Sequence, residues 1–107
     1  MRYKVYLISE AEEDLYELYN YVSRRDSIEK AEYAIEKIHE ACLNLSEFPN
    51  RGHTPPELER IGFLEYKEIH FKPYRIIYQV LGTKVFVHCV LDGRRDLQEL
   101  LEKRLLR

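Results

Sequence analysis

The chain has 107 residues, of which 45% are hydrophobic and 34% are charged, and its formal net charge is −2. This length favours one domain over residues 1–107, and the composition is typical of a globular protein rather than a disordered one. No apolar run approaches the roughly 18 residues of a membrane span, and the N-terminal segment becomes acidic too soon for a signal peptide. We therefore expect a cytoplasmic protein without a membrane partner.

Charge is unevenly distributed along the chain. Residues 1–50 contain 6 basic and 11 acidic side chains, whereas residues 51–107 contain 11 basic and 8 acidic ones. The basic excess in the second half favours an acidic or nucleic-acid partner there.

The N-terminal segment predicts a strand that leads into a helix. Aromatic and β-branched residues alternate over residues 2–8, as in a strand. Ser9 and Glu12 have the spacing of a capping box, and the apolar residues that follow recur at helical spacing to about Arg25.

A second helix follows directly. Asp26 and Glu29 repeat the N-terminal capping pattern, and Pro49 cannot continue the helix. The connection between the two helices is short, which predicts an antiparallel helical hairpin. The apolar stripe of the second helix comprises Ala31, Ala34, Ile35, Ile38, Ala41, Cys42 and Leu45.

Strand-like segments dominate the second half, after a loop over residues 49–56. The last two are separated by Gly82-Thr83, a spacing that suits a tight hairpin. Asp92-Gly93 ends the last strand, and Asp96 is a candidate cap for a final helix that carries Leu97, Leu100, Leu101 and Leu105. The predicted strands cover residues 64–71, 74–81 and 85–91.

The predicted element order is β-α-α-β-β-β-α. Consecutive strands on short turns imply an antiparallel sheet, and a helical hairpin packed on one of its faces makes the fold α+β. Cys42 and Cys89 occupy apolar positions, so we expect them in the core as free thiols. No cysteine or histidine motif has the spacing of a zinc site, and we expect neither a metal nor a cofactor.

Three stretches resemble the RelE/ParE superfamily of type II toxins along essentially the whole chain. They are Tyr6–Leu15, where the strand enters the helix, Phe48–Leu58, which is the loop after the hairpin, and Pro73–Val80 followed by Val90–Asp96. The resemblance implies the toxin of a toxin–antitoxin pair, neutralised by a cognate antitoxin, with a higher-order complex of the two as an option. RelE-like members are ribosome-dependent endoribonucleases that cut messenger RNA, whereas ParE-like members inhibit DNA gyrase by binding it.

The RelE-like activity would use a cluster of basic residues and a C-terminal tyrosine. Lys67, Arg75 and Arg95 stand where three of the basic residues fall, and such cations stabilise charge on a phosphate. Leu101 occupies the position of the tyrosine, and Ile69 that of the second lysine. Leucine cannot transfer a proton. By residue type, His53, His70 and His88 are candidates for that role, but nothing in the sequence places one beside the basic cluster.

The resemblance therefore favours the ParE-like branch. The expected contacts to the target are Arg94, Arg95, Arg75 and Lys67. For Arg94-Arg95 the reason is that the pair lies on a loop just past the sheet, and loops often carry function. Two alternatives stay open: Arg75 could pair with a carboxylate such as Glu68, and Arg94-Arg95 could be a solvated turn. A third overall reading is a toxin fold that has lost its activity.

The leucine stripe of the last helix has two interpretations. Leu97, Leu100 and Leu101 could offer a groove for the antitoxin, or they could close the core. The sequence does not distinguish these.

Overall fold

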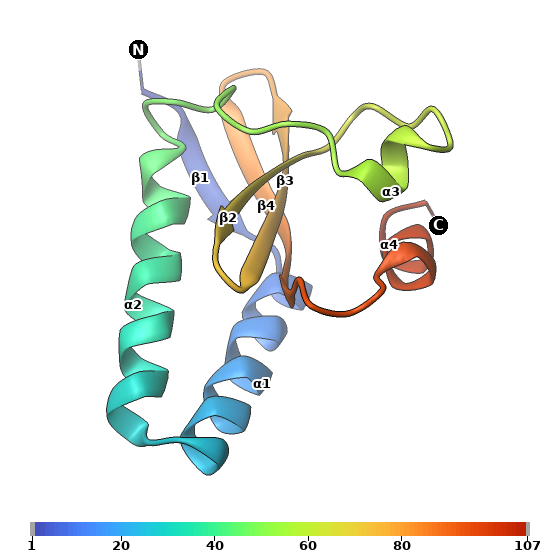
Figure 1. Cartoon of the computed structure of the whole chain (residues 1–107). Helices are drawn as coiled ribbons and strands as arrows, with labels where there is room; N and C mark the ends of the chain where they lie inside the picture. The colour runs from blue at the N-terminus through green and yellow to red at the C-terminus, as the bar shows by residue number, and fades with distance from the viewer. Residues whose placement is uncertain (1, 107) are drawn as a thin grey trace.

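A four-stranded sheet lies between two layers of helices (Figure 1). The computed structural model describes residues 2–106. The strand order in the sheet is β1-β4-β3-β2. The elements are β1 (Lys4–Leu7), α1 (Ser9–Arg25), α2 (Ile28–Asn44), α3 (Pro56–Glu59), β2 (Lys67–Phe71), β3 (Tyr74–Leu81), β4 (Lys84–Asp92) and α4 (Gln98–Leu105).

Helices α1 and α2 form the predicted hairpin, but their caps differ from the prediction. Ser9 is already inside α1, because the amide of Ile8 still donates to the carbonyl oxygen of Val87 in β4, at 3.1 Å, and the chain passes directly from strand to helix. Ser27, and not Asp26, caps α2: its hydroxyl accepts a hydrogen bond from the amide of Lys30 at 3.1 Å. Both helices nevertheless begin within two residues of the expected positions.

The sheet is antiparallel over β2, β3 and β4, as predicted. Strand β1 adds to the edge of β4 in the parallel direction, with Lys4 opposite Lys84, which the sequence did not reveal. A parallel pair needs a long connection, and here that connection contains the hairpin and the other two strands.

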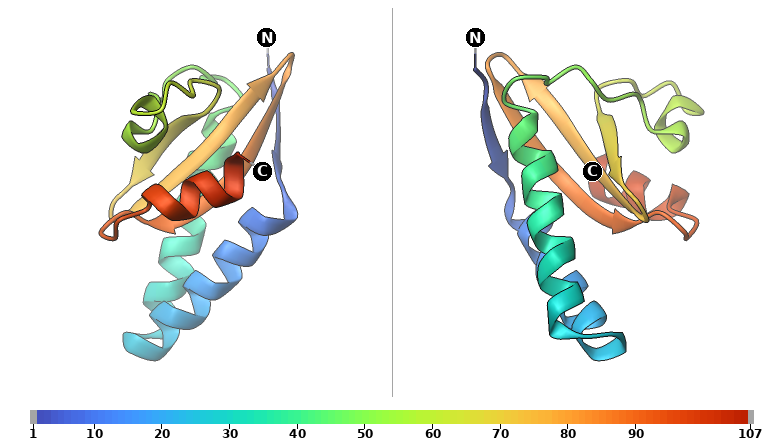
Figure 2. Two further views of the ribbon diagram at one scale, coloured as in Figure 1. Left: turned by 90° about the vertical axis from the view of Figure 1, so that its right-hand side faces the viewer. Right: turned by 60° about the vertical axis from the view of Figure 1, so that its left-hand side comes forward.

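Each face of the sheet has its own core. The hairpin buries one face, where Tyr78 and Ile76 meet Ile38 of α2 with no exposed side-chain surface. On the other face α3 and α4 cover Ile77 and Cys89. Figure 2 shows α2 and α4 on opposite sides of the sheet. The short helix α3 lies in a segment predicted as a loop, because a four-residue helix that begins at the second proline of a pair carries no helical periodicity.

Helix α4 is fastened to the rest of the chain by Arg104. Its guanidinium donates two hydrogen bonds to Asp14 of α1, at 3.0 and 3.1 Å, and one to the carbonyl oxygen of His88 at 2.7 Å. Cys42 and Cys89 are buried free thiols, as predicted, and burial raises the pKa of each to about 12. Among residues 2–106 no helix is long and apolar enough to cross a bilayer.

Candidate functional site

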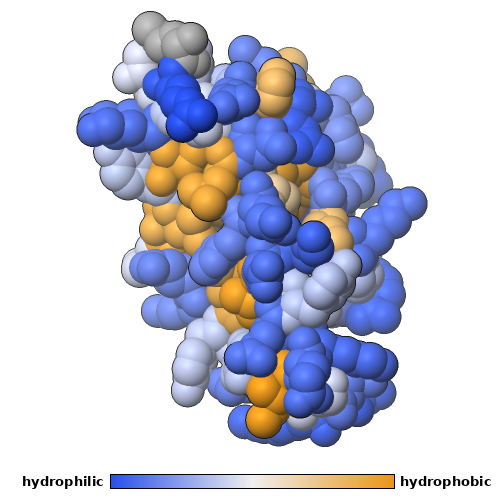
Figure 3. Space-filling model, turned by 90° about the vertical axis from the view of Figure 1, so that its left-hand side faces the viewer, coloured by the Kyte–Doolittle hydropathy of each residue, from blue (hydrophilic) through white to orange (hydrophobic). Residues whose placement is uncertain are grey.

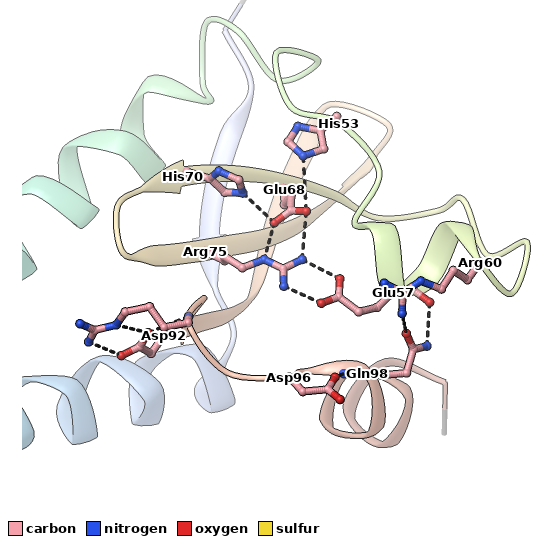
Figure 4. A network of polar contacts seen from close by, with 10 residues as sticks. His53, Glu57, Arg60, Glu68, His70, Arg75, Asp92, Asp96 and Gln98 are labelled. Carbon is pink, nitrogen blue, oxygen red and sulfur yellow. Dashed lines mark hydrogen bonds and ion pairs between the residues drawn. The ribbon is translucent and has the colours of Figure 1, made fainter.

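Arg75 lies at the centre of a polar network on the α3 side of the sheet (Figure 4). Its two Nη atoms donate to both oxygens of Glu57 on α3, at 2.6 and 2.7 Å. Its Nε and Nη2 donate to the two oxygens of Glu68 on β2, at 2.7 and 3.0 Å. The Arg75 side chain is only 12% exposed, so two carboxylates occupy the guanidinium almost completely.

These contacts favour the ionised forms of Glu57 and Arg75. The hydrogen bonds from Arg75 hold the pKa of Glu57 below its usual value, and the bonds to Glu57 raise the pKa of Arg75 further. The alternative that Arg75 pairs with Glu68 is therefore confirmed. The partner that sequence reasoning missed is Glu57, which lies in the segment expected to be a loop.

The loop before α3 is held against β2 by close backbone contact. His53 and Glu68 exchange two backbone hydrogen bonds, at 3.2 and 2.7 Å. A Cβ at Gly52 would lie 2.5 Å from the Glu68 carbonyl oxygen and 2.7 Å from the Tyr78 hydroxyl. Only glycine allows this approach, and it is the reason that the loop follows β2.

Two histidines, His53 and His70, lie beside this network, although no pattern in the sequence predicts their position there. The Nε2 atom of His70 is 3.0 Å from one oxygen of Glu68, and that of His53 is 3.4 Å from the other. The rings are 5.5 Å apart between centroids and nearly perpendicular. Glu68 is buried, whereas the side chains of His53 and His70 are 61% and 40% exposed.

The turn after β4 rests on the stem of Arg75. The amide of Gly93 donates to the Pro73 carbonyl oxygen at 2.8 Å. A Cβ at Gly93 would lie 2.8 Å from both Cγ and Cδ of Arg75. Gly93 is thus needed for close approach rather than for a left-handed backbone, since the positive-φ glycines of the described chain are Gly62 and Gly82.

The turn presents two exposed arginines that differ in their contacts. Arg94 donates to the carboxylate of Asp92, at 2.6 and 3.0 Å, which lowers the pKa of Asp92. Arg95 makes no hydrogen bond or ion pair with residues 2–106, and it lines a groove between α1 and the ends of β3 and β4. Tyr21 and Tyr74 line the same groove.

The three basic residues of the RelE-like hypothesis do not converge. Lys67 alternates with Glu68 along β2 and therefore faces the hairpin side of the sheet, as Ile69 does. Arg75 faces the α3 side, and Arg95 lies in the turn beyond β4.

The leucines of α4 close the core in this structure, which is one of the two roles that the sequence left open for them. Leu97 and Leu101 have no exposed surface and pack with Leu58 and Ile77. Leu100 is partly buried against the same cluster. Helix α4 is short and has one apolar stripe, and that stripe packs against the sheet.

His88 lies apart from the polar network around Arg75 and has a structural role. Its ring packs edge-on against Tyr66, at 5.2 Å between centroids, and burial lowers its pKa. Its Nε2 atom is buried without a hydrogen-bond partner in the described chain.

A family profile and a related sequence both match ParE toxins. The profile of the family described as "ParE toxin of type II toxin-antitoxin system, parDE" matches residues 5–97. Toxin ParE3 of Caulobacter vibrioides is 28% identical over 91 residues, which cover 85% of this chain and 87% of that protein.

Two solved structures share the fold. The chromosomal ParDE toxin–antitoxin system from P. aeruginosa superposes with a TM-score of 0.70 at 19% identity, covering 83% of this chain and 94% of that one. The toxin–antitoxin complex RelBE2 from Mycobacterium tuberculosis gives a TM-score of 0.63 at 20% identity, covering 84% and 96%.

Proposed function

We propose, from the premise that this chain belongs to the family of ParE toxins of type II toxin–antitoxin systems, that it acts by binding and inhibiting DNA gyrase. The observation that carries the proposal is the pair Arg94-Arg95, which is exposed on a turn that the buried Arg75 supports from below. Arginine at an exposed turn is suited to bidentate contact with an acidic partner surface.

The contacts to the target are assigned by accessibility. Arg95 is free to bind a partner, and Arg94 can exchange Asp92 for a partner carboxylate, since an exposed ion pair is worth little. Arg75 acts as a positioning residue, because a target would have to displace Glu57 or Glu68 to reach it. Lys67 is half-buried on the other face and contributes a peripheral contact at most.

RNA cleavage is the second candidate, and one observation favours it. His53 and His70 lie close together beside Glu68 and are of the type that transfers protons. The electrostatics oppose it: two carboxylates surround one guanidinium, which leaves an excess negative charge that repels a phosphate. Leu101 and Ile69, at the positions of the RelE tyrosine and lysine, are buried in the two cores.

We also place a cognate antitoxin among the partners. Both structural relatives are toxin–antitoxin systems. Because Leu97 and Leu101 are buried, we look for the antitoxin surface on the helical hairpin, where Tyr16, Tyr33 and Leu43 are more than half exposed. Figure 3 shows hydrophobic patches between hydrophilic ones on the α2 side of the molecule. An antitoxin tail that folds on binding could cover them.

A two-arm assay tests the target. Purified protein is added to gyrase with relaxed plasmid, and in parallel to a translating system whose messages are mapped for breaks. Inhibition of supercoiling with intact messages supports the proposal. Codon-positioned cuts with unaffected supercoiling would replace it with the RelE-like activity. If neither occurs and expression leaves growth unaffected, the chain is a toxin fold without activity.

A further inference from the structure

We propose that His53, Glu68 and His70 bind a divalent transition-metal cation of the zinc class and so tie the 49–55 loop to β2. The site does not rest on gyrase as the target, because none of its three residues is among the arginines assigned to contact with gyrase. Two imidazoles and one carboxylate are a ligand set that such cations accept.

The three side chains converge on one point. His53 and His70 approach Glu68 from different sides, and both turn Nε2 toward its carboxylate (Figure 4). One ligand atom from each residue lies within 4.8 Å of the others. A tetrahedral ion with bonds of about 2.1 Å places its ligands about 3.4 Å apart. The Nε2 atom of His70 lies 3.0 Å from one Glu68 oxygen and that of His53 lies 3.4 Å from the other, so each imidazole is near that spacing from the carboxylate and Glu68 would bind the ion through both oxygens.

The backbone holds these ligands in place before any ion arrives. His53 and Glu68 are joined by a pair of backbone hydrogen bonds, and glycine at 52 permits the loop to approach. His70 is two residues from Glu68 on the same strand, so the two side chains share a face of the sheet. Little conformational entropy is then lost on binding.

The local charge favours a cation. Arg75 would repel an ion if it were alone, but Glu57 and Glu68 together outnumber it by one negative charge. Arg75 donates to both oxygens of Glu68, at 2.7 and 3.0 Å, and Glu57 binds the far side of the guanidinium at 2.6 and 2.7 Å, so the three groups together carry one net negative charge beside the histidines. The same excess charge that repels a phosphate attracts a divalent ion.

The ligands are also accessible. Glu68 is buried, but the side chains of His53 and His70 are 61% and 40% exposed, so an ion can reach their Nε2 atoms from solvent and water can complete its coordination. The two thiols of the chain are not competitors, because Cys42 and Cys89 are buried in the cores.

Titration of the full-length, tag-free chain with Zn²⁺ and with Co²⁺ tests the site. The affinity for Zn²⁺ is measured by competition with a chromophoric chelator, and the Co²⁺ complex is followed by its visible absorption. We expect one ion per chain, and a loss of affinity of at least about tenfold in His53→Gln and in His70→Gln. His39→Gln, which removes an exposed histidine of α2, is the matched control and should bind as the unmodified chain does.

Three results would overturn the proposal. They are equal affinity in the two cluster variants and the control, loss of affinity in His39→Gln alone, and a thiolate-to-cobalt band that assigns the ion to a cysteine. All three variants change exposed side chains, so circular dichroism should show the same fold in each. A variant that fails this check is replaced by His53→Ala or His70→Ala in the same titration.

Discussion

The guanidinium of Arg75 faces the carboxylate of Glu57 edge to edge, with Nη1 2.6 Å from Oε2 and Nη2 2.7 Å from Oε1. This pair joins β3 to α3 and keeps the stem of Arg75 under Gly93. Arg75 is thus bound by carboxylates of its own chain and stabilises the fold. The turn that contacts its side chain presents Arg94 and Arg95, which are exposed.

The substitution Arg75→Ala should lower the free energy of unfolding, and this effect does not require any contact with the target. Glu57 and Glu68 would lose their common cation while staying largely buried, which costs about 3–5 kcal/mol. Urea unfolding followed by circular dichroism measures this. Arg2→Ala, which breaks the exposed pair with Glu47, is the control and should unfold near the unmodified chain. A variant at Arg75 that keeps full stability and loses toxicity would instead make Arg75 a contact residue.

The two closely approached glycines should differ in their tolerance of alanine. At Gly52 the obstacle is the backbone carbonyl of Glu68 at 2.5 Å, which cannot move without breaking the loop away from β2. At Gly93 the nearest atoms, at 2.8 Å, are side-chain carbons of Arg75, which can shift more readily than backbone, and the Pro73 carbonyl oxygen is farther away at 3.0 Å. Gly52→Ala is therefore expected to lower the melting temperature more than Gly93→Ala. The reverse order would show that the turn, and not the loop, is the rigid contact.

The free energy of unfolding should decrease at acidic pH, in part because Glu57 becomes protonated. Its folded pKa lies below the usual 4.5, chiefly because of the hydrogen bonds from Arg75. The stability that it contributes is complete above 4.5 and is lost as the pH falls through the lower folded value. Asp14 acts in the opposite sense, since burial raises its pKa. The free energy of unfolding, measured by urea at a series of acidic pH values, should fall less steeply in Glu57→Gln. An unchanged slope would contradict this role.

Features that leave a local pattern in the sequence could be predicted, whereas contacts between distant segments could not. The apolar stripe of α2 and the strand alternation are local patterns, so the hairpin and the three antiparallel strands were predicted. The pairing of Arg75 with Glu68 could be proposed from neighbouring strands. Glu57 could not, because its helix has only four residues and joins the network through tertiary packing.

The two histidines illustrate the same limit. His53 reaches Glu68 through a single isolated bridge between a loop and a strand, and such a bridge leaves no periodic signal. The sequence likewise could not predict what the α4 leucines pack against, since an amphipathic stripe has the same pattern whether it covers its own sheet or a partner. In the structure they pack against Leu58 and Ile77 of their own chain.

Replacing His88 by phenylalanine should leave stability near neutral pH unchanged or improved. The ring contact with Tyr66 survives, and the buried unpaired Nε2 is removed. Burial, with a smaller effect of Arg104, holds the pKa of His88 below 6.5, so its neutral form stabilises the fold above 6.5 and this contribution fades as the pH falls through the lower folded value. Unfolding in urea at neutral and mildly acidic pH should show a smaller loss in His88→Phe. A strongly destabilised variant would reveal a hidden partner of Nε2.

Inhibition of gyrase supercoiling by Arg94→Ala/Arg95→Ala tests the central claim most directly. The matched control is Arg24→Ala/Arg25→Ala, which removes another adjacent, exposed arginine pair at the end of α1. We predict that the first variant melts like the unmodified chain and loses inhibition, whereas the control keeps it. Equal inhibition by both variants, or a loss of the cooperative melt in the first, would show that this turn is not the surface that contacts the target.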